Sequence, residues 1–130
     1  MEDIELTVPI TKVDETQRLA FGWASVIEEA DGTPVVDLQN HLIEVEELEQ
    51  AVYRYMIEAR GVTHMHKDRA GEVVESVMLT REKRRAMGLD ESGPVGWWVG
   101  LRLSPATFAR VQRGELGAFS IGGRGVLEDL

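Results

Sequence analysis

Apolar and polar residues alternate along the first part of the chain and predict a pair of strands. Residues 4–13 have the two-residue period of a strand with one buried face, and Pro9 places this strand at a sheet edge or at a bulge. Residues 14–17 form a polar turn, and the apolar and aromatic run 18–27 predicts a second strand. We expect the two strands to pair as an antiparallel hairpin.

Residues 44–60 carry the clearest helical pattern in the chain. Glutamates crowd the first half of this segment, where the helix dipole favours negative charge, and Gly61 is placed to end it. Its apolar residues recur at spacings of three and four, which predicts a helix with one buried face. These apolar residues are Val45, Leu48, Val52, Tyr55 and Ala59.

Strand patterns return after this helix. Residues 62–66 have a period of two, so His64 and His66 lie on one face of the predicted strand. The runs 72–79 and 95–103 are also strand-like, and the glycines of the second run indicate close packing.

Two shorter segments are predicted to be helical. Residues 80–87 are charged and are followed by Gly88, which can end a short helix. Ser104 as the N-cap and Pro105 at the first helical position predict another helix, which ends before Gly114.

A final strand is predicted around Ser120. Side chains alternate along a strand, so Phe119 and Ile121 point to one face and Ser120 points to the other. Gly122 and Gly123 allow another backbone to come close. Such a position suits a nucleophile, but it is also typical of an ordinary strand residue.

These elements predict one α+β domain over residues 1–130. We expect a mostly antiparallel, β-barrel-like sheet of about six strands, with one longer and one or two shorter helices. Of the neighbouring Trp97 and Trp98, one is expected in the core and the other at the surface or at an interface.

Composition narrows the function. Fourteen basic and 23 acidic residues give a net charge of -9, which argues against binding to a nucleic-acid backbone. No apolar run approaches the roughly 18 residues of a membrane span, and no signal peptide is evident. The chain has no cysteine, so covalent catalysis needs another nucleophile.

A serine nucleophile needs an imidazole to take its proton, and His64 and His66 are candidates. The same pair has the spacing of metal ligands, but a zinc site needs a third protein ligand, such as His41 or Asp68. The sequence fixes no such ligand, so we predict neither a metal nor another cofactor.

A series of motifs in a fixed order adds a family resemblance. The chain resembles the phage prohead (capsid maturation) proteases, and most closely the XkdF-like phage serine proteases. The likeness covers nearly the whole chain and rests on KVDE (12–15), RLAFG (18–22), VDLQNH (36–41), MHK (65–67), GEVVES (71–76), GWWVG (96–100) and VQRGELGAFSIGG (111–123).

The resemblance implies an assemblin-like fold, named after the herpesvirus proteases, and a serine endopeptidase. Ser120 matches the nucleophile and His66 the general base, because His64 lies further from the loop that follows the motif histidine. Backbone N–H groups would stabilise the oxyanion, and the candidates close to Ser120 in sequence are Gly122, Gly123 and Arg124.

The third catalytic residue is left open. In related proteases it often follows the serine, but Glu128 and Asp129 lie at a terminus that we expect to be frayed. We name Glu75 first, and the alternatives are His64, Asp68 and Asp37.

The resemblance also implies partners and a location. The substrates would be phage scaffold and major capsid protein precursors, cut inside the assembling prohead in the host bacterial cytoplasm. A homo-oligomer is compatible with this function. A non-catalytic head-assembly or scaffold-binding domain on the same fold is the alternative, and it is favoured by the missing downstream third residue and by the acidic helix.

Overall fold

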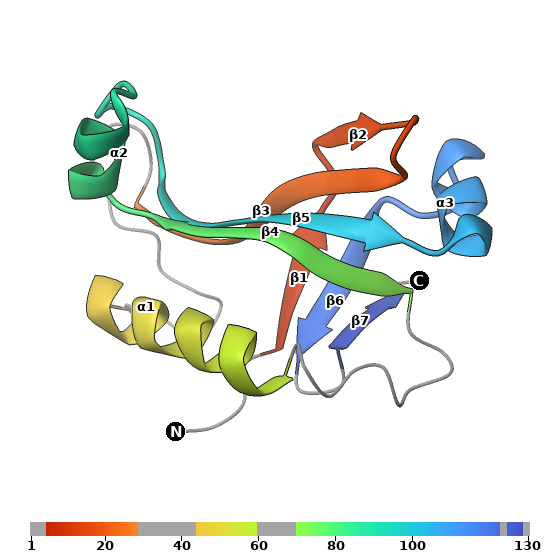
Figure 1. The fold of residues 1–130 in the computed structure, drawn as a ribbon, viewed down its shortest axis with the longest axis horizontal. Coiled ribbons are helices and arrows are strands. Elements are labelled where there is room, and N and C mark those ends of the chain that lie inside the picture. Colours follow the sequence, from red (N-terminus) through yellow and green to blue (C-terminus); the bar gives the residue numbers. More distant parts are fainter. Residues whose placement is uncertain (1–4, 29–43, 60–69, 123–124, 129–130) are drawn as a thin grey trace.

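The computed structural model describes residues 5–28, 44–59, 70–122 and 125–128. They form an α+β fold in which every strand pairing is antiparallel, as predicted (Figure 1). The elements are β1 (Glu5–Pro9), β2 (Lys12–Asp14), β3 (Leu19–Glu28), α1 (Val45–Arg54), the π-helical turn η1 (Tyr55–Ala59), β4 (Gly71–Leu79), α2 (Arg81–Met87), β5 (Val95–Leu103), α3 (Pro105–Gln112), β6 (Ala118–Gly122) and β7 (Gly125–Glu128).

The seven strands of the described chain follow one another in the order β1-β6-β7-β4-β5-β3-β2. The group β4-β5-β3-β2 and the group β1-β6-β7 meet through a single pair, Gly71 with Val126. In Figure 1 the long strands of the first group run at a steep angle to those of the second. The strands do not close into a barrel, so the barrel-like part of the predicted fold class is not confirmed.

The first predicted strand is two strands in the structure. β1 pairs with β6, and β2 pairs with β3, so the predicted hairpin is correct only for β2 and β3. The chain changes partner at two successive residues, because Ile10 N donates to Gly117 O at 2.9 Å and Thr11 N donates to Phe21 O at 2.8 Å. One short stretch of chain, β1 and β2, therefore forms both ends of the strand order.

The predicted polar turn between β2 and β3 is confirmed. The Asp14 carboxylate accepts hydrogen bonds from the backbone N–H groups of Thr16, at 3.1 Å, and of Gln17, at 3.3 Å. The side-chain hydrogen bonds from Thr16 and then Gln17 are the main causes that lower the pKa of Asp14. The turn is thus built by local bonds to one carboxylate.

The core lies between the strands and helix α1. Trp97 of β5 is fully buried, and its Nε1 donates to Ser76 Oγ at 2.8 Å. Tyr55 packs edge-on against Trp97, with ring centroids 5.5 Å apart. Trp98 is partly exposed and stacks on Phe21, so the division of the two tryptophans between core and surface is confirmed.

The long predicted helix begins as expected at Val45 but changes its geometry at Tyr55, where the π-helical turn starts. Three of the predicted core positions, Leu48, Val52 and Tyr55, are buried. Lys83 of α2 holds this helix: its Nζ donates to Glu49 Oε2 at 3.1 Å and to Tyr53 OH at 2.9 Å. The end of α1 is therefore fixed against the sheet and α2.

The predicted caps at Gly88 and Ser104 are confirmed, whereas Thr80, predicted as the first helical residue, is the N-cap of α2. Thr80 Oγ1 accepts from Lys83 N at 3.1 Å, and Gly88 ends α2 with a φ of 76°. Ser104 Oγ accepts from Thr107 N at 3.2 Å, and Pro105 is the first residue of α3. The end of α2 and the start of α3 therefore follow from single residues of the sequence.

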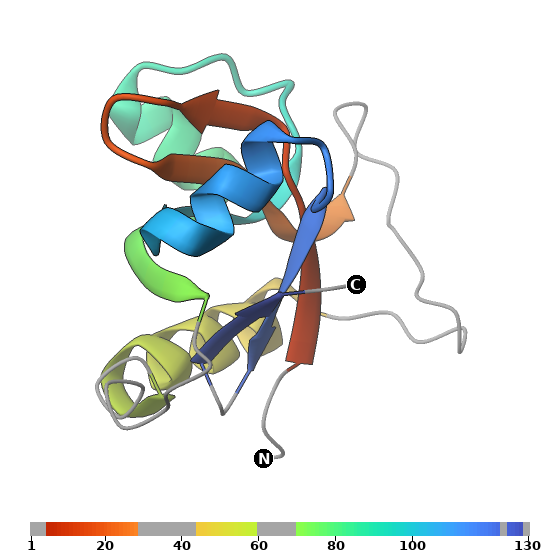
Figure 2. The same ribbon diagram turned by 90° about the vertical axis from the view of Figure 1, so that its right-hand side faces the viewer.

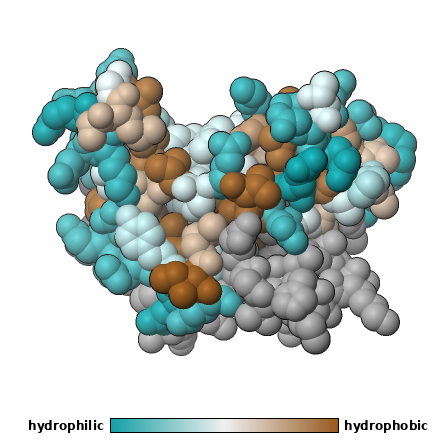
Figure 3. Space-filling model, in the orientation of Figure 1, coloured by the Kyte–Doolittle hydropathy of each residue, from teal (hydrophilic) through white to brown (hydrophobic). Residues whose placement is uncertain are grey.

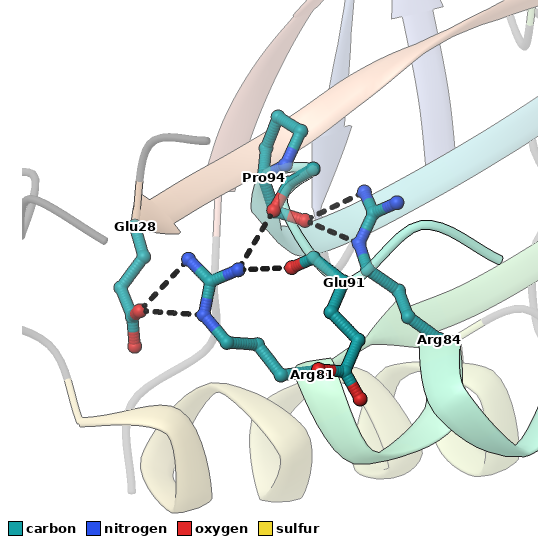
Figure 4. A network of polar contacts seen from close by, with 6 residues as sticks. Glu28, Arg81, Arg84, Glu91 and Pro94 are labelled. Atoms are coloured by element: carbon teal, nitrogen blue, oxygen red, sulfur yellow. Dashed lines mark hydrogen bonds and ion pairs between the residues drawn. The ribbon is translucent and has the colours of Figure 1, made fainter. Parts of the chain in front are cut away.

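Two arginines of α2 hold the loop between α2 and β5 (Figure 4). Arg84 is buried and donates to Pro94 O, with its closer contact at 2.8 Å, and to Asp90 O at 3.2 Å. Arg81 donates to the Glu28 carboxylate at 3.2 Å and to the backbone oxygen of Glu91. The loop is therefore tied both to α2 and to the end of β3.

Large apolar side chains are also exposed in the described part of the chain. Figure 3 shows brown apolar residues at several places on one face, separated by hydrophilic ones. The exposed residues are Val13, Tyr53, Ile57, Val74, Met87 and Leu89. They belong to six different segments, so exposure alone does not mark one binding surface.

We predict that Arg84→Met lowers the free energy of unfolding by about 1–3 kcal/mol, because buried carbonyl groups lose their donor. Urea unfolding measures this loss. Arg85→Met is the matched control: Arg85 lies on the same helix but is exposed and pairs with Glu91 at the surface. Equal losses for the two variants would contradict the role assigned to Arg84.

Candidate active site

Ser120 lies in the middle of β6, as predicted. Its neighbours Phe119 and Ile121 are both 0% exposed and belong to the core, whereas Ser120 is half-buried. Because strand side chains alternate, Ser120 points away from the core. The two buried neighbours also fix the strand, since a slip by one residue would expose them both.

Ser120 is paired with Thr7 of β1 on one side and with Leu127 of β7 on the other. Figure 2 shows β6 beside β1. The bond from Ile10 N to Gly117 O makes that pair a hydrogen-bonded one, and such pairs alternate along the ladder. Thr7 and Ser120 are therefore a non-hydrogen-bonded pair, the kind in which side chains lie closest.

The same alternation gives the direction of the Ser120 backbone. Its N–H and C=O face β7, where Leu127 is its partner. Gly122 pairs with Gly125 two residues further along, and its backbone faces the same way. The N–H groups of these two residues are therefore used in the strand ladder. Gly123 and Arg124, the other two oxyanion candidates, lie outside the described residues.

Strand β7 was missed by the sequence prediction. Glu128, placed at a frayed terminus there, is the last residue of β7 and pairs with Phe119. The signal was present: two residues, Gly123 and Arg124, separate the apolar end of β6 from Val126 and Leu127, which is a hairpin spacing. Asp129 lies outside the described residues.

All three histidines, His41, His64 and His66, lie outside the described residues, and so do Asp37 and Asp68. The candidate ligands of the alternative metal site, His64 and His66 with His41 or Asp68, are all among these residues. Among the residues that the structure describes, no group of three His, Cys, Asp or Glu side chains could hold a metal ion.

The described chain resumes close to the nucleophile candidate. Gly71 of β4 pairs with Val126, and Val126 pairs with Ile121, the residue after Ser120. With strands about 4.8 Å apart, the start of β4 lies about 10 Å from β6. Ala70 is buried, and its carbonyl accepts from Ser104 N at 2.9 Å. The segment that contains both candidate bases thus ends at a fixed point beside the site.

Glu75, the first candidate for the third catalytic residue, lies away from Ser120. It is exposed on β4 and pairs with Gly100 of β5. It lies four residues beyond Gly71, which is about 13 Å along a strand, in addition to the two strand spacings that separate β4 from β6. The structure therefore does not bring Glu75 next to Ser120.

Comparison with known protein families matches residues 7–128 to the family described as "Putative phage serine protease XkdF". The matched range contains Ser120, both candidate bases and nearly all of the described fold. No curated protein and no solved structure matches the chain. No helix of the described residues is long and apolar enough to cross a membrane.

We predict that Ser120→Ala changes the free energy of unfolding by less than about 1 kcal/mol, because it removes one oxygen from a half-buried position. Phe119→Ala, one position away, is expected to cost about 3–5 kcal/mol through the cavity that it leaves. Urea unfolding of both variants tests the alternation of β6. A large loss for Ser120→Ala would place that side chain in the core instead.

Proposed function

Because the chain belongs to the family described as "Putative phage serine protease XkdF", we propose that it is a serine endopeptidase with Ser120 as nucleophile. The proposed general base is His66. The proposed substrates are phage scaffold and major capsid protein precursors, cut inside the assembling prohead in the host cytoplasm. Assembly as a homo-oligomer is compatible with this role.

The observation that carries the proposal is the position of Ser120. Its hydroxyl lies on the outer face of a strand whose two neighbouring side chains are locked in the core. The strand next but one begins immediately after the segment with His64 and His66. A nucleophile on a rigid strand, with a base supplied from an adjoining segment, meets the first geometric requirement of acyl transfer.

The proposed reaction follows the general serine mechanism. His66 takes the proton of Ser120 Oγ as that oxygen attacks the peptide carbonyl carbon. The tetrahedral intermediate then expels the amine, which receives the proton from His66. Water, activated by the same imidazole, attacks the acyl-enzyme and releases the second product.

The third member is proposed to come from the segment that supplies the base. Asp68 precedes Ala70 by two residues and His64 precedes it by six, and Ala70 lies beside the site. Glu75 has the weaker support, because its position on β4 is far along the strand from Ser120. The alternative is a catalytic dyad, in which Ser120 and His66 act without a third residue.

Oxyanion stabilisation has fewer backbone candidates than the sequence suggested. The N–H groups of Ser120 and Gly122 face β7 in the ladder. Gly123 and Arg124, in the two-residue connection to β7, stay as the proposed backbone donors. An intermediate oxyanion needs such donors at about 2.7–3.1 Å.

We predict that Ser120→Ala abolishes cleavage of a co-expressed scaffold or capsid precursor. Ser25→Ala is the matched control, because Ser25 is also half-buried on a strand. Gel electrophoresis and mass spectrometry of the precursor report the cleavage. Cleavage that persists in the Ser120→Ala variant would remove Ser120 from the role of nucleophile.

We further predict that a fluorophosphonate probe labels Ser120, and that His66→Gln slows this labelling by at least about 100-fold. His64→Gln is the control and is expected to have a much smaller effect. The reverse order would make His64 the base. A protein that binds precursor but is neither labelled nor able to cut it would support the non-catalytic assembly domain.

A further inference from the structure

We propose that Thr7 is a catalytic residue: its hydroxyl donates a hydrogen bond to the oxyanion that forms when Ser120 attacks a substrate carbonyl. This role rests on the proposed function of Ser120 as the nucleophile. It is carried by the pairing of β1 with β6, which places a second hydroxyl beside the first.

The pairing brings the two side chains together on one face. Thr7 and Ser120 are directly opposite in a non-hydrogen-bonded pair, in which Cα atoms are about 4.5 Å apart and side chains are closest. The register is fixed on both strands, because Val8 is 1% exposed and Phe119 and Ile121 are 0% exposed. Thr7 itself is exposed, so a substrate on this face can reach it.

Thr7 lies on the side of Ser120 where we expect the oxyanion, and not on the side of the leaving group. Ala70 lies on the β4 side of Ser120 and follows the proposed base, His66, by four residues, so on this proposal the base approaches from that side. That base must also protonate the leaving amine, so the leaving group lies on the same side. Thr7 lies on the opposite side of Ser120, where the carbonyl oxygen can turn as the tetrahedral centre forms.

A side-chain donor is needed for the oxyanion because nearby backbone N–H groups are used in the strand ladder. In many acyl-transfer sites the nucleophile's own backbone N–H contributes to the oxyanion hole. Here the N–H groups of Ser120 and Gly122 face their β7 partners. A hydroxyl is an adequate substitute, because side-chain donors also serve in such sites.

The step balances without any additional reactant. The bond from Ser120 Oγ to the carbonyl carbon forms, the carbonyl π electrons move to oxygen, and the Ser120 proton goes to His66. Thr7 keeps its own proton and only donates a hydrogen bond to the new oxyanion. When the carbonyl reforms, the carbon–nitrogen bond breaks and the amine takes the proton from His66.

The test uses the complete chain and two simple reagents, 4-nitrophenyl acetate as the substrate and a fluorophosphonate as the covalent probe. Thr7→Val keeps the shape of the side chain and removes the donor, whereas Thr7→Ser keeps the donor. Thr11→Val is the matched control: Thr11 is exposed in the same stretch, but its hydroxyl bonds to Phe21 O. Urea unfolding verifies that all the variants fold.

We expect Thr7→Val to lower kcat by about 100-fold with little change in KM, the usual effect of losing one oxyanion donor. Fluorophosphonate labelling of Ser120 should slow to a similar degree. Thr7→Ser and Thr11→Val should stay within about threefold of the unsubstituted chain, since a threefold change is below the effect of one net hydrogen bond.

Three results would overturn this role. Unchanged rates in Thr7→Val, or a change in KM alone, would remove Thr7 from the oxyanion site while leaving Ser120 as the nucleophile. Loss of activity in Thr7→Ser as large as in Thr7→Val would show that the methyl group matters and the hydroxyl does not. An unsubstituted chain that neither hydrolyses the ester nor labels at Ser120 would overturn the proposed function itself.

Discussion

The structure depends on one short stretch of backbone, residues 5–14, that supplies the strands at both ends of the strand order. Residues 5–9 pair with β6, residues 12–14 pair with β3, and the switch takes place at Ile10 and Thr11. Backbone hydrogen bonds leave little freedom here, because each N–H needs a partner once it is removed from water. Pro9 falls at a non-hydrogen-bonded position, so its missing N–H costs the β1–β6 ladder nothing.

This constraint determines what lies beside Ser120. The pairing of β1 with β6 sets Thr7 opposite Ser120, and the buried neighbours on both strands hold that register. On the other side, β7 and the first residue of β4 connect the site to the end of the segment with both histidines. Ser120 therefore lies between Thr7 on one side and the start of β4 on the other, on a face that points away from the core.

Much of the fold could be predicted from the sequence, because strand alternation and helix caps depend on residues that are close together in the chain. The strand 95–103, the caps at Gly88 and Ser104 and the alternation around Ser120 all follow from the properties of neighbouring residues. The partner of β1 could not be predicted in that way, because pairing joins residues more than 100 positions apart. One signal was available: apolar residues occupy even positions up to Ile10 but the odd position Val13, and this change of phase marks the bend.

The candidate site was only half predictable for the same reason. The resemblance and the strand pattern identified Ser120, but neither indicated Thr7, which lies in a polar position of an unremarkable strand. The distance of Glu75 from Ser120 depends on two strand pairings and on its place along β4, and the sequence alone reveals none of these. Residues that act together across a sheet become visible only when the register is known.

A crystal structure of the chain after reaction with a fluorophosphonate would test the central claim most directly. The account predicts a covalent bond to Ser120 Oγ and a His66 ring nitrogen within about 3.2 Å of that oxygen. A phosphonyl group on another residue, or both His64 and His66 beyond hydrogen-bond reach of Ser120, would contradict it.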